Sequence, residues 1–420
     1  MKNFLLTLTF AVFAFTASAC WEPEDPDPQP YDGENPFQPI ELTTKQAGLV
    51  RTGNAFSLNL IHRVDSFQKS GNEKDKSWFI SPLSLQFALG MLLNGAQEGT
   101  AAQICQTLGY SEGQTDEVNA LCKLLLERLP EIDRQTELKI ADAIFYNKNV
   151  SLLPSFEKAV QDNYSAGLQA LDFTKTKASA GTINKWCSDQ TKGMIPSVID
   201  EVDPAALAYL VNAIYFKSQW ADKFPKSATE KETFTYENGG KDKLPMMKLQ
   251  EKRFSYNEND VCQMVCLPYG NGAFSMTVLL PKKGHTVSDV AAMLDKDGVP
   301  YGRETIVDLW LPRFETKYHI LLNDILCDMG MPGAFNPMTA NFLAMSKKPS
   351  HIDFVQQDAV IKVDEEGSEA AAVTVIGMKF TSAVPQEPKR AVFHADHPFL
   401  YLITEASTGS ILFAGEFTGK

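Results

Sequence analysis

Side chains that often carry catalysis are present in this sequence, but none of them lies in a catalytic spacing. The six histidines are dispersed, and no two have the His-Glu-x-x-His spacing that holds a catalytic zinc ion. The sequence also contains no Gly-x-Ser-x-Gly turn for a serine nucleophile, no phosphate-binding loop and no dinucleotide-binding glycine pattern. We therefore predict a protein that is not an enzyme and that uses no metal ion or other cofactor.

The segment 363–374 constrains the function most, because its composition suits two conformations. Ser368, followed by a glutamate and three alanines, is typical of a helix start, whereas the β-branched residues that come next favour an extended chain. Gly367 gives the backbone in front of them freedom to change φ and ψ. Written as a strand, the segment has one uncharged face that begins with small side chains: Ser368, Ala370, Ala372 and Thr374. The pattern predicts a loop in one state and a buried strand in another; the alternative is an ordinary surface loop.

The beginning of the chain has the composition of an export signal. A short basic start precedes an apolar run over residues 4–19 that is too short for a comfortable membrane span. Residues 17–20, Ala-Ser-Ala-Cys, resemble a bacterial lipoprotein processing site. This resemblance implies a signal peptide over residues 1–19 and a lipid anchor on Cys20 that holds the protein on the bacterial outer membrane, at the cell surface. An ordinary signal peptide with a leftover cysteine is the alternative. Residues 20–43 are acidic and rich in proline, and predict an extended tether.

Residues 44–420 predict one large domain that mixes helices and strands, because no second linker, repeat or low-complexity segment interrupts them. A monomer is expected. The formal net charge of −13 argues against a nucleic acid as partner. Six further cysteines show no zinc spacing and are expected to be buried free thiols: Cys105, Cys122, Cys187, Cys262, Cys266 and Cys327.

Longer motifs, spread from about Asn54 to the end of the chain, resemble those of the serpin family. They are a strand end that leads into a buried helix (78–92), an apolar strand (208–220) and two closing strands (397–403 and 411–415). The segment 363–374 itself resembles the hinge of the serpin reactive loop. The resemblance implies an α+β serpin fold, in which a central and mostly antiparallel β-sheet is accompanied by further β-sheets, surrounding helices and an exposed reactive loop.

The serpin resemblance assigns roles to two groups of residues. The hinge group, which would let the loop enter the central sheet, comprises Glu365, Gly367, Ser368, Glu369, Ala370, Ala371, Ala372 and Thr374. The sheet-opening group, which would hold that sheet shut, comprises Ser81, Ser84, Asn212, Gln357 and Trp220. Asn212 is expected to bond to groups around Ser81 and to the strand before the hinge, and Trp220 to cover the point where the loop enters.

Three residues depart from the serpin pattern. Gln357 stands where many serpins have a histidine; its amide still donates and accepts hydrogen bonds, but it excludes a proton-dependent opening through this residue. Asp142 replaces a more frequent asparagine. Glu416 replaces a commoner arginine, and we expect little consequence.

The serpin resemblance implies suicide-substrate inhibition of extracellular serine proteases. The target, for which a cysteine protease is a further candidate, would attack the loop and form a covalent acyl-enzyme, and the cut loop would then insert into the sheet. Counting from Gly367 places the reactive bond at Thr381–Ser382, which suits an elastase-like protease. Lys379 and Phe380 remain alternatives that would suit trypsin-like and chymotrypsin-like proteases. The alternative function is a serpin-fold binding protein that does not inhibit.

Overall fold

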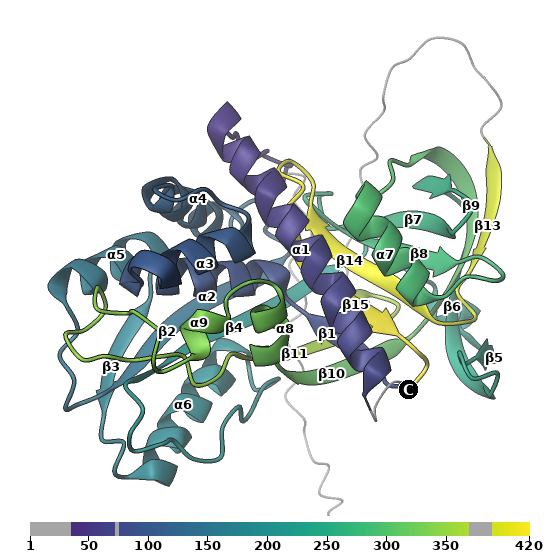
Figure 1. The fold of residues 1–420 in the computed structure, drawn as a ribbon. Coiled ribbons are helices and arrows are strands. Elements are labelled where there is room, and N and C mark those ends of the chain that lie inside the picture. The colour runs from purple at the N-terminus through teal and green to yellow at the C-terminus, as the bar shows by residue number, and fades with distance from the viewer. Residues whose placement is uncertain (1–34, 72–74, 369–388) are drawn as a thin grey trace, which may run out of the picture.

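The computed structural model describes residues 35–71, 75–368 and 389–420 (Figure 1). The predicted signal peptide lies outside the described residues, and so do most of the predicted loop positions. The site residues affected are Cys20, Glu369, Ala370, Ala371, Ala372, Thr374, Lys379, Phe380, Thr381 and Ser382.

The described residues form helices whose ends follow local sequence signals. The longest helix begins after Thr43, which forms a capping box with Gln46, and the second begins after Ser81 with Pro82 in its first turn. The helices are α1 (Thr44–Ser70), α2 (Pro82–Gly95), α3 (Glu98–Leu108), α4 (Thr115–Arg128), α5 (Pro154–Tyr164), α6 (Thr176–Gln190), α7 (Val287–Asp297), α8 (Asn323–Asp328), α9 (Pro332–Phe335) and the 3₁₀ turn η1 (Lys226–Ala228). None of these helices, within the described ranges, is long and apolar enough to cross a membrane.

A six-stranded sheet contains the site that concerns us. Its strands, in spatial order, are β10 (Phe314–Leu321), β11 (Gln356–Val363), β12 (Gly367–Ser368), β4 (Ala208–Gln219), β2 (Glu137–Asn147) and β3 (Gly167–Leu171). All neighbours are antiparallel except β2 and β3, which are parallel. We call this the central sheet.

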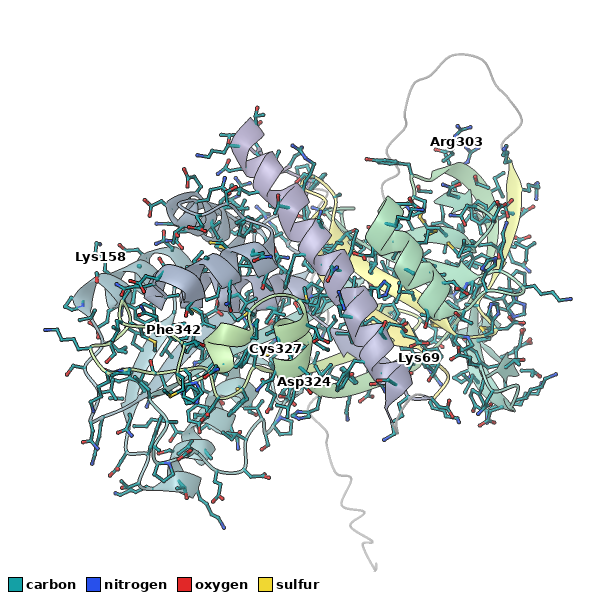
Figure 2. All side chains as sticks on the ribbon, in the orientation of Figure 1. Lys69, Lys158, Arg303, Asp324, Cys327 and Phe342 are labelled. Carbon is teal, nitrogen blue, oxygen red and sulfur yellow. The ribbon has the colours of Figure 1, made fainter. Side chains whose placement is uncertain are left out.

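A second, nine-stranded sheet packs beside the central sheet. Its strands follow the order β1 (Trp78–Ile80), β15 (Ile411–Phe417), β14 (Phe399–Glu405), β8 (Phe274–Pro281), β7 (Cys262–Tyr269), β6 (Lys241–Glu258), β9 (Arg303–Pro312) and β13 (Arg390–His394), with β5 (Glu230–Thr235) also paired to β6. The chain re-enters the described structure at β13, at the end of the molecule where Arg303 is labelled in Figure 2.

Helices cover both faces of the central sheet. On one face, Leu138 and Ile214 belong to the main core together with the buried residues of α2. On the other face, Phe145 and Tyr209 pack with Ile183 of α6 in a smaller core. The period-two alternation of β2 and β4 therefore sends successive residues into two different cores. Helices plus mostly antiparallel sheets confirm the predicted α+β fold.

The packed body begins earlier in the chain than the sequence predicted. Ile40 is buried, and its N–H donates to Ser407 Oγ at 2.9 Å. The Nδ2 atom of Asn35, which is also buried, donates to Asp133 Oδ1 at 2.7 Å. Two residues of the predicted tether, Asn35 and Ile40, thus lie against the domain: the core takes up the side chain of Ile40, and Asp133 accepts a hydrogen bond from Asn35.

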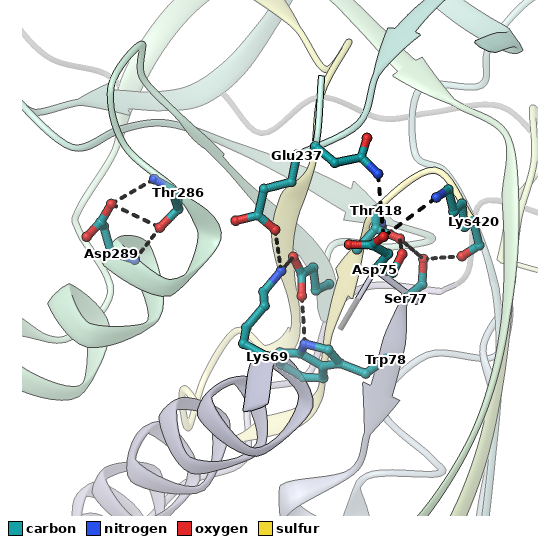
Figure 3. A network of polar contacts seen from close by, with 11 residues as sticks. Lys69, Asp75, Ser77, Trp78, Glu237, Thr286, Asp289, Thr418 and Lys420 are labelled. Carbon is teal, nitrogen blue, oxygen red and sulfur yellow. Dashed lines mark hydrogen bonds and ion pairs between the residues drawn. The ribbon is translucent and has the colours of Figure 1, made fainter. Parts of the chain in front are cut away.

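Glu416 has a larger structural role than the sequence suggested, and Figure 3 shows its surroundings. Its carboxylate is fully buried and accepts hydrogen bonds from Lys69 Nζ at 2.8 Å and Trp78 Nε1 at 2.9 Å. Burial raises the pKa of Glu416 to about 7, against the opposing effect of Lys69. Glu416 thus ties the end of α1 to β1 and β15, a role that the sequence did not predict.

Of the six cysteines expected to be buried free thiols, all are free, and four are buried. Cys266 and Cys327 are only partly buried.

Candidate functional site

The hinge begins as a strand inside the central sheet. Gly367 and Ser368 form β12, which pairs with Gln219 and Ser218 of β4 on one side. On its other side, Ser368 pairs with Val363 of β11. The start of the predicted inserting segment is therefore already a strand between β4 and β11.

Gly367 is required by a close approach of two backbones. Its φ of +157° is outside the range that other residues readily adopt. A Cβ atom at this position would lie 2.2 Å from the carbonyl oxygen of Ser218. The sequence predicted a glycine that frees the backbone; the structure adds that only a glycine fits against β4.

Ser368 is held by a phenol from the neighbouring sheet. It is buried, and its hydroxyl lies 2.8 Å from the hydroxyl of Tyr269. Burial raises the pKa of Tyr269, and the contact with Ser368 partly opposes that rise, so the phenol stays protonated. Ser218, opposite Ser368, contacts Thr136 of the segment before β2 with 2.6 Å between the hydroxyl oxygens. A buried row of hydroxyls thus lines the point where the chain enters the sheet.

Trp220 covers this point, at the end of β4. Its indole Nε1 donates to the carbonyl oxygen of Asp364 at 2.8 Å, and its backbone N–H donates to that of Glu366 at 2.9 Å. Its ring stacks on Tyr269 with 4.4 Å between centroids and 11° between planes. Trp220 therefore bonds to the turn that leads into β12 and packs against the residue that holds Ser368.

Two glutamates fix the turn before β12 by different means. Glu365 is buried and accepts a hydrogen bond from Thr229 Oγ1 at 2.8 Å, with Arg313 at 3.5 Å. Glu366 pairs with Lys223 and Lys226, each at 3.1 Å. Burial alone would raise the pKa of Glu366, but the two lysines outweigh it and lower that pKa below its usual value. Ion pairs thus hold the turn at Glu366, and burial together with a hydrogen bond holds it at Glu365.

Further along the central sheet from β12, Gln357 near the start of β11 forms hydrogen bonds to the start of α2. Its Nε2 donates to the Ser81 carbonyl oxygen and its Oε1 accepts from the Ser81 N–H, both at 2.9 Å. The Ser81 hydroxyl donates to the carbonyl oxygen of Leu412 at 2.7 Å and accepts from the N–H of Ser84 at 3.3 Å. Ser81 is thus the N-cap of α2, whereas Ser84 is a residue that it caps.

Beyond β12, towards the start of β11, β4 and β11 are not paired with each other, and no other strand of the described residues lies between them. A cavity of about 330 Å³ lies in this region. Phe342, labelled near α9 in Figure 2, is part of its wall. Further wall residues come from four elements: Ala208 to Ala213 of β4, Gln356 to Asp358 of β11, Ser84 and Leu85 of α2, and Ile183 and Cys187 of α6. The cavity brings together Ser84, Asn212 and Gln357 from the predicted sheet-opening group.

The partner of Asn212 differs from the one that we expected. Its Nδ2 donates to Asp142 Oδ1 of β2 at 2.8 Å, rather than to groups around Ser81 or on β11. The reason is the register of the sheet, which places Asp142 directly opposite Asn212. Cross-strand neighbours on one face lie close enough to bond, whereas Gln357 lies across the cavity.

Sequence reasoning missed Tyr269 and Asp142 as members of this site. Tyr269 lies in an apolar strand of the second sheet, and only the packing of the two sheets brings it to Ser368. Asp142 carried a usable signal, because a carboxylate inside an apolar strand needs a partner.

These features define a class of protein in which, over the described residues, the central sheet is incomplete between two strands and the next strand has only begun. The chain matches the family model described as "Serpin (serine protease inhibitor)" over residues 51–419. It is 33% identical to the human leukocyte elastase inhibitor over 382 residues, which are 86% of this chain and 97% of that protein. Serpin B6 of Macaca fascicularis is 32% identical over 383 residues, with 88% and 99% covered.

Solved structures are similar in fold to most of this chain. The thermophilic serpin tengpin in its native state has a TM-score of 0.76 at 26% identity, covering 92% of this chain and 97% of that one. Thyroxine-binding globulin in complex with thyroxine has a TM-score of 0.77 at 28% identity, covering 89% and 99%. The chain belongs to the serpin family, which confirms the predicted resemblance.

Proposed function

We propose that this protein is a suicide-substrate inhibitor of extracellular serine proteases. The target attacks the segment after β12 and forms an acyl-enzyme, and the cut segment then continues β12 down the central sheet. The relationship to serpin B6 and to the leukocyte elastase inhibitor supports inhibition of serine proteases as the activity.

The observation that carries this proposal is the position of β12. Its two residues already pair with β4 and β11, and below them lies a cavity between the same two strands. A strand that continued this register would place residue 374, six positions after Ser368, opposite Asn212 on β4 and Gln357 on β11. Thr374 would then carry a hydroxyl between two amides, which suits a buried position.

The residue types after β12 favour inhibition over the alternative of a binding protein that has the serpin fold but does not inhibit. Ser368 faces the core, and the residues that would follow it on the same face are Ala370, Ala372 and Thr374. None of them is charged or bulky, so the core face of the inserted strand would contain no unpaired charge. A large charged residue on this face would have favoured the alternative.

We also propose which class of protease the protein inhibits and where the protein is located. Thr381–Ser382 as the reactive bond favours an elastase-like protease, while Lys379 or Phe380 would favour trypsin-like or chymotrypsin-like enzymes. A cysteine protease is a further candidate target. A lipid on Cys20 would hold the inhibitor on the outer membrane, at the cell surface, where it would meet proteases from outside the cell.

The test is to mix the full chain with neutrophil-type elastase, chymotrypsin and trypsin, and to analyse the products by denaturing gel and mass spectrometry. We expect a complex that survives denaturant and a released C-terminal peptide that begins at Ser382. A peptide that begins at Phe380 or Thr381 would move the reactive bond to Lys379 or Phe380. Clean cleavage by all three proteases without a complex would contradict inhibition and favour the non-inhibitory alternative.

A further inference from the structure

Asp142 is a carboxylate in the interior of the central sheet. It lies on β2 directly opposite Asn212 of β4, and its side chain is buried at 4% exposure. The two side chains share the sheet face that packs on α2, because Leu138 and Ile214 on the same face belong to the core that α2 completes. The contact between them is the hydrogen bond from Asn212 Nδ2 to Asp142 Oδ1, at 2.8 Å.

Each partner of this pair has an oxygen atom left over. Asp142 Oδ2 and Asn212 Oδ1 are both buried, and neither has a hydrogen-bond partner in the described part of the chain. A buried acceptor without a partner destabilises by about 1–3 kcal/mol. An ionised carboxylate can only accept hydrogen bonds, whereas a protonated one also donates. A single proton on Asp142 Oδ2 would therefore satisfy both atoms by closing a two-bond ring with the amide.

No positively charged group in the described part of the chain favours the ionised form of Asp142. Burial raises the pKa of Asp142 to about 7, and the hydrogen bond from Asn212 opposes this rise; no lysine, arginine or histidine of the described chain contributes. Two other titratable groups face it, Cys122 of α4 and Tyr164 of α5. Burial raises the pKa of both, so both are neutral at physiological pH. The helix α2, which covers this face, has no titratable residue.

Asn212 also belongs to the wall of the cavity between β4 and β11. Its orientation is set by the one hydrogen bond to Asp142, which fixes the nitrogen and leaves the oxygen free. A strand that fills the cavity brings donors of its own beside Asn212. If Asp142 is ionised, such a donor gives the free oxygen its first hydrogen bond; if Asp142 already donates to this oxygen, the strand can add only a second bond, which stabilises the filled sheet less.

We propose that Asp142 is a positioning residue that makes strand insertion proton-dependent through Asn212. When Asp142 is ionised, it holds the nitrogen of Asn212 and leaves the oxygen to the incoming strand. When Asp142 is protonated, it bonds that oxygen itself, and the intact sheet is the better satisfied state. This inference rests on the function proposed above.

The sign of the pH effect follows from linkage. In the intact sheet, burial raises the pKa of Asp142 to about 7. An inserted strand that donates to Asn212 Oδ1 would make the proton on Asp142 less favourable, so this pKa would be lower in the inserted state. Protonation of Asp142 therefore stabilises the intact sheet relative to the inserted one, and this effect is lost as the pH rises through about 7. Insertion should accordingly be slower at acid pH than at alkaline pH.

The test follows insertion in the full chain by a readout that needs no target protease. The segment after β12 is cut with a non-specific protease, and the rate at which the protein gains heat resistance is measured between about pH 5.5 and about pH 8.5. The wild type should insert roughly fivefold faster at the alkaline end, the effect of one hydrogen bond of about 1 kcal/mol. D142N cannot titrate and retains both a donor and an acceptor, so it should stay at the slow rate throughout.

The matched control is D189N, which makes the same chemical change at an exposed, Lys185-paired position of α6. It should keep the pH dependence of the wild type. Rates of wild type and D142N that stay in constant ratio across the range would overturn the inference. Because Glu416 also titrates near neutrality, this ratio isolates Asp142 better than the wild-type profile alone.

A second measurement covers the case in which D142N does not fold. An NMR titration of the Asp142 carboxyl carbon in the wild-type chain should give a midpoint near 7, and a midpoint near 4 would overturn the inference. Failure of the proposed function gives a different result. If the cut segment does not insert, no variant gains heat resistance at any pH; if it inserts but the protein does not inhibit, heat resistance still appears while the protease mixtures contain no denaturant-stable complex.

Discussion

The gap between β4 and β11 in the central sheet is built differently in two places. We call the end that contains β12 the top of the gap, and the region around Asn212 and Gln357 its middle. At the top, β12 and the turn before it are fixed by Trp220, Tyr269 and Glu365, through hydrogen bonds, ring stacking and ion pairs. In the middle, the space between β4 and β11 is a cavity, and the Asp142–Asn212 pair has two buried oxygens that find no hydrogen-bond partner among the described residues.

The comparison shows which part of the gap could still gain hydrogen bonds. At the top, β12 is formed and its polar groups are largely hydrogen-bonded, so the chain is held in one register. In the middle, the facing edges of β4 and β11, which pair with no strand of the described residues, would gain backbone hydrogen bonds from a further strand. Under the proposed function, the cut segment would therefore extend β12 from the fixed end of the gap towards its middle.

The largest expected effect comes from a charge on the core face of the inserting segment. Ala370→Arg should abolish the denaturant-stable complex and turn the protein into a substrate, because the inserted strand would bury an unpaired charge at several kcal/mol. The control is Ala371→Arg, one residue along and on the opposite face, which should still form the complex. Equal complex yields for the two variants, measured by denaturing gel, would contradict the assignment of faces.

Gly367→Ala should disrupt the top of the gap. The added Cβ would lie 2.2 Å from the carbonyl oxygen of Ser218, and backbone cannot move aside as a side chain can. We expect the free energy of unfolding to fall by about 2 kcal/mol, within the 1–3 kcal/mol that is typical of overpacking, and insertion to become slower. Gly99→Ala is the control, because its Cβ would meet nothing within 4 Å. Chemical denaturation checks both, and a stability of Gly367→Ala equal to that of the control would argue against a tight β12.

Gln357→Leu should loosen the link between β11 and α2. It removes both hydrogen bonds to Ser81 and leaves the Ser81 N–H without its partner, a loss of about 1–3 kcal/mol. The variant should have a lower unfolding midpoint and, if this link holds the sheet shut, a faster insertion after cleavage. Insertion that stays at the wild-type rate while stability falls would limit Gln357 to a structural role.

The smallest expected effect is the coupling between Tyr269 and Ser368. A double-mutant cycle with Tyr269→Phe and Ser368→Ala should give a coupling of about 1 kcal/mol, the value of one buried hydrogen bond. Chemical denaturation of the four proteins measures it. A coupling near zero would mean that β12 is held by its backbone pairing and by Trp220 alone.

Much of the fold and the start of the hinge could be predicted from the sequence, because their signals are local. The alternation of β4, the proline and serine at the start of α2, and the glycine before Ser368 all lie within short windows. The contact of Tyr269 with Ser368 could not be predicted, since it depends on how two sheets pack. Nor could the partner of Asn212, which depends on the register between β2 and β4. A shift of register by one residue would have placed Asp142 on the other face.

The central claim is that the gap between β4 and β11 accepts a strand after the segment that follows β12 is cut. Hydrogen–deuterium exchange before and after cleavage tests this most directly, with peptides from β4, β11 and, as reference, β9. We predict that amides of β4 and β11 below β12 become strongly protected, while those of β9 do not change. Equal exchange in β4 and β11 before and after cleavage would show that no strand enters, and would contradict the account.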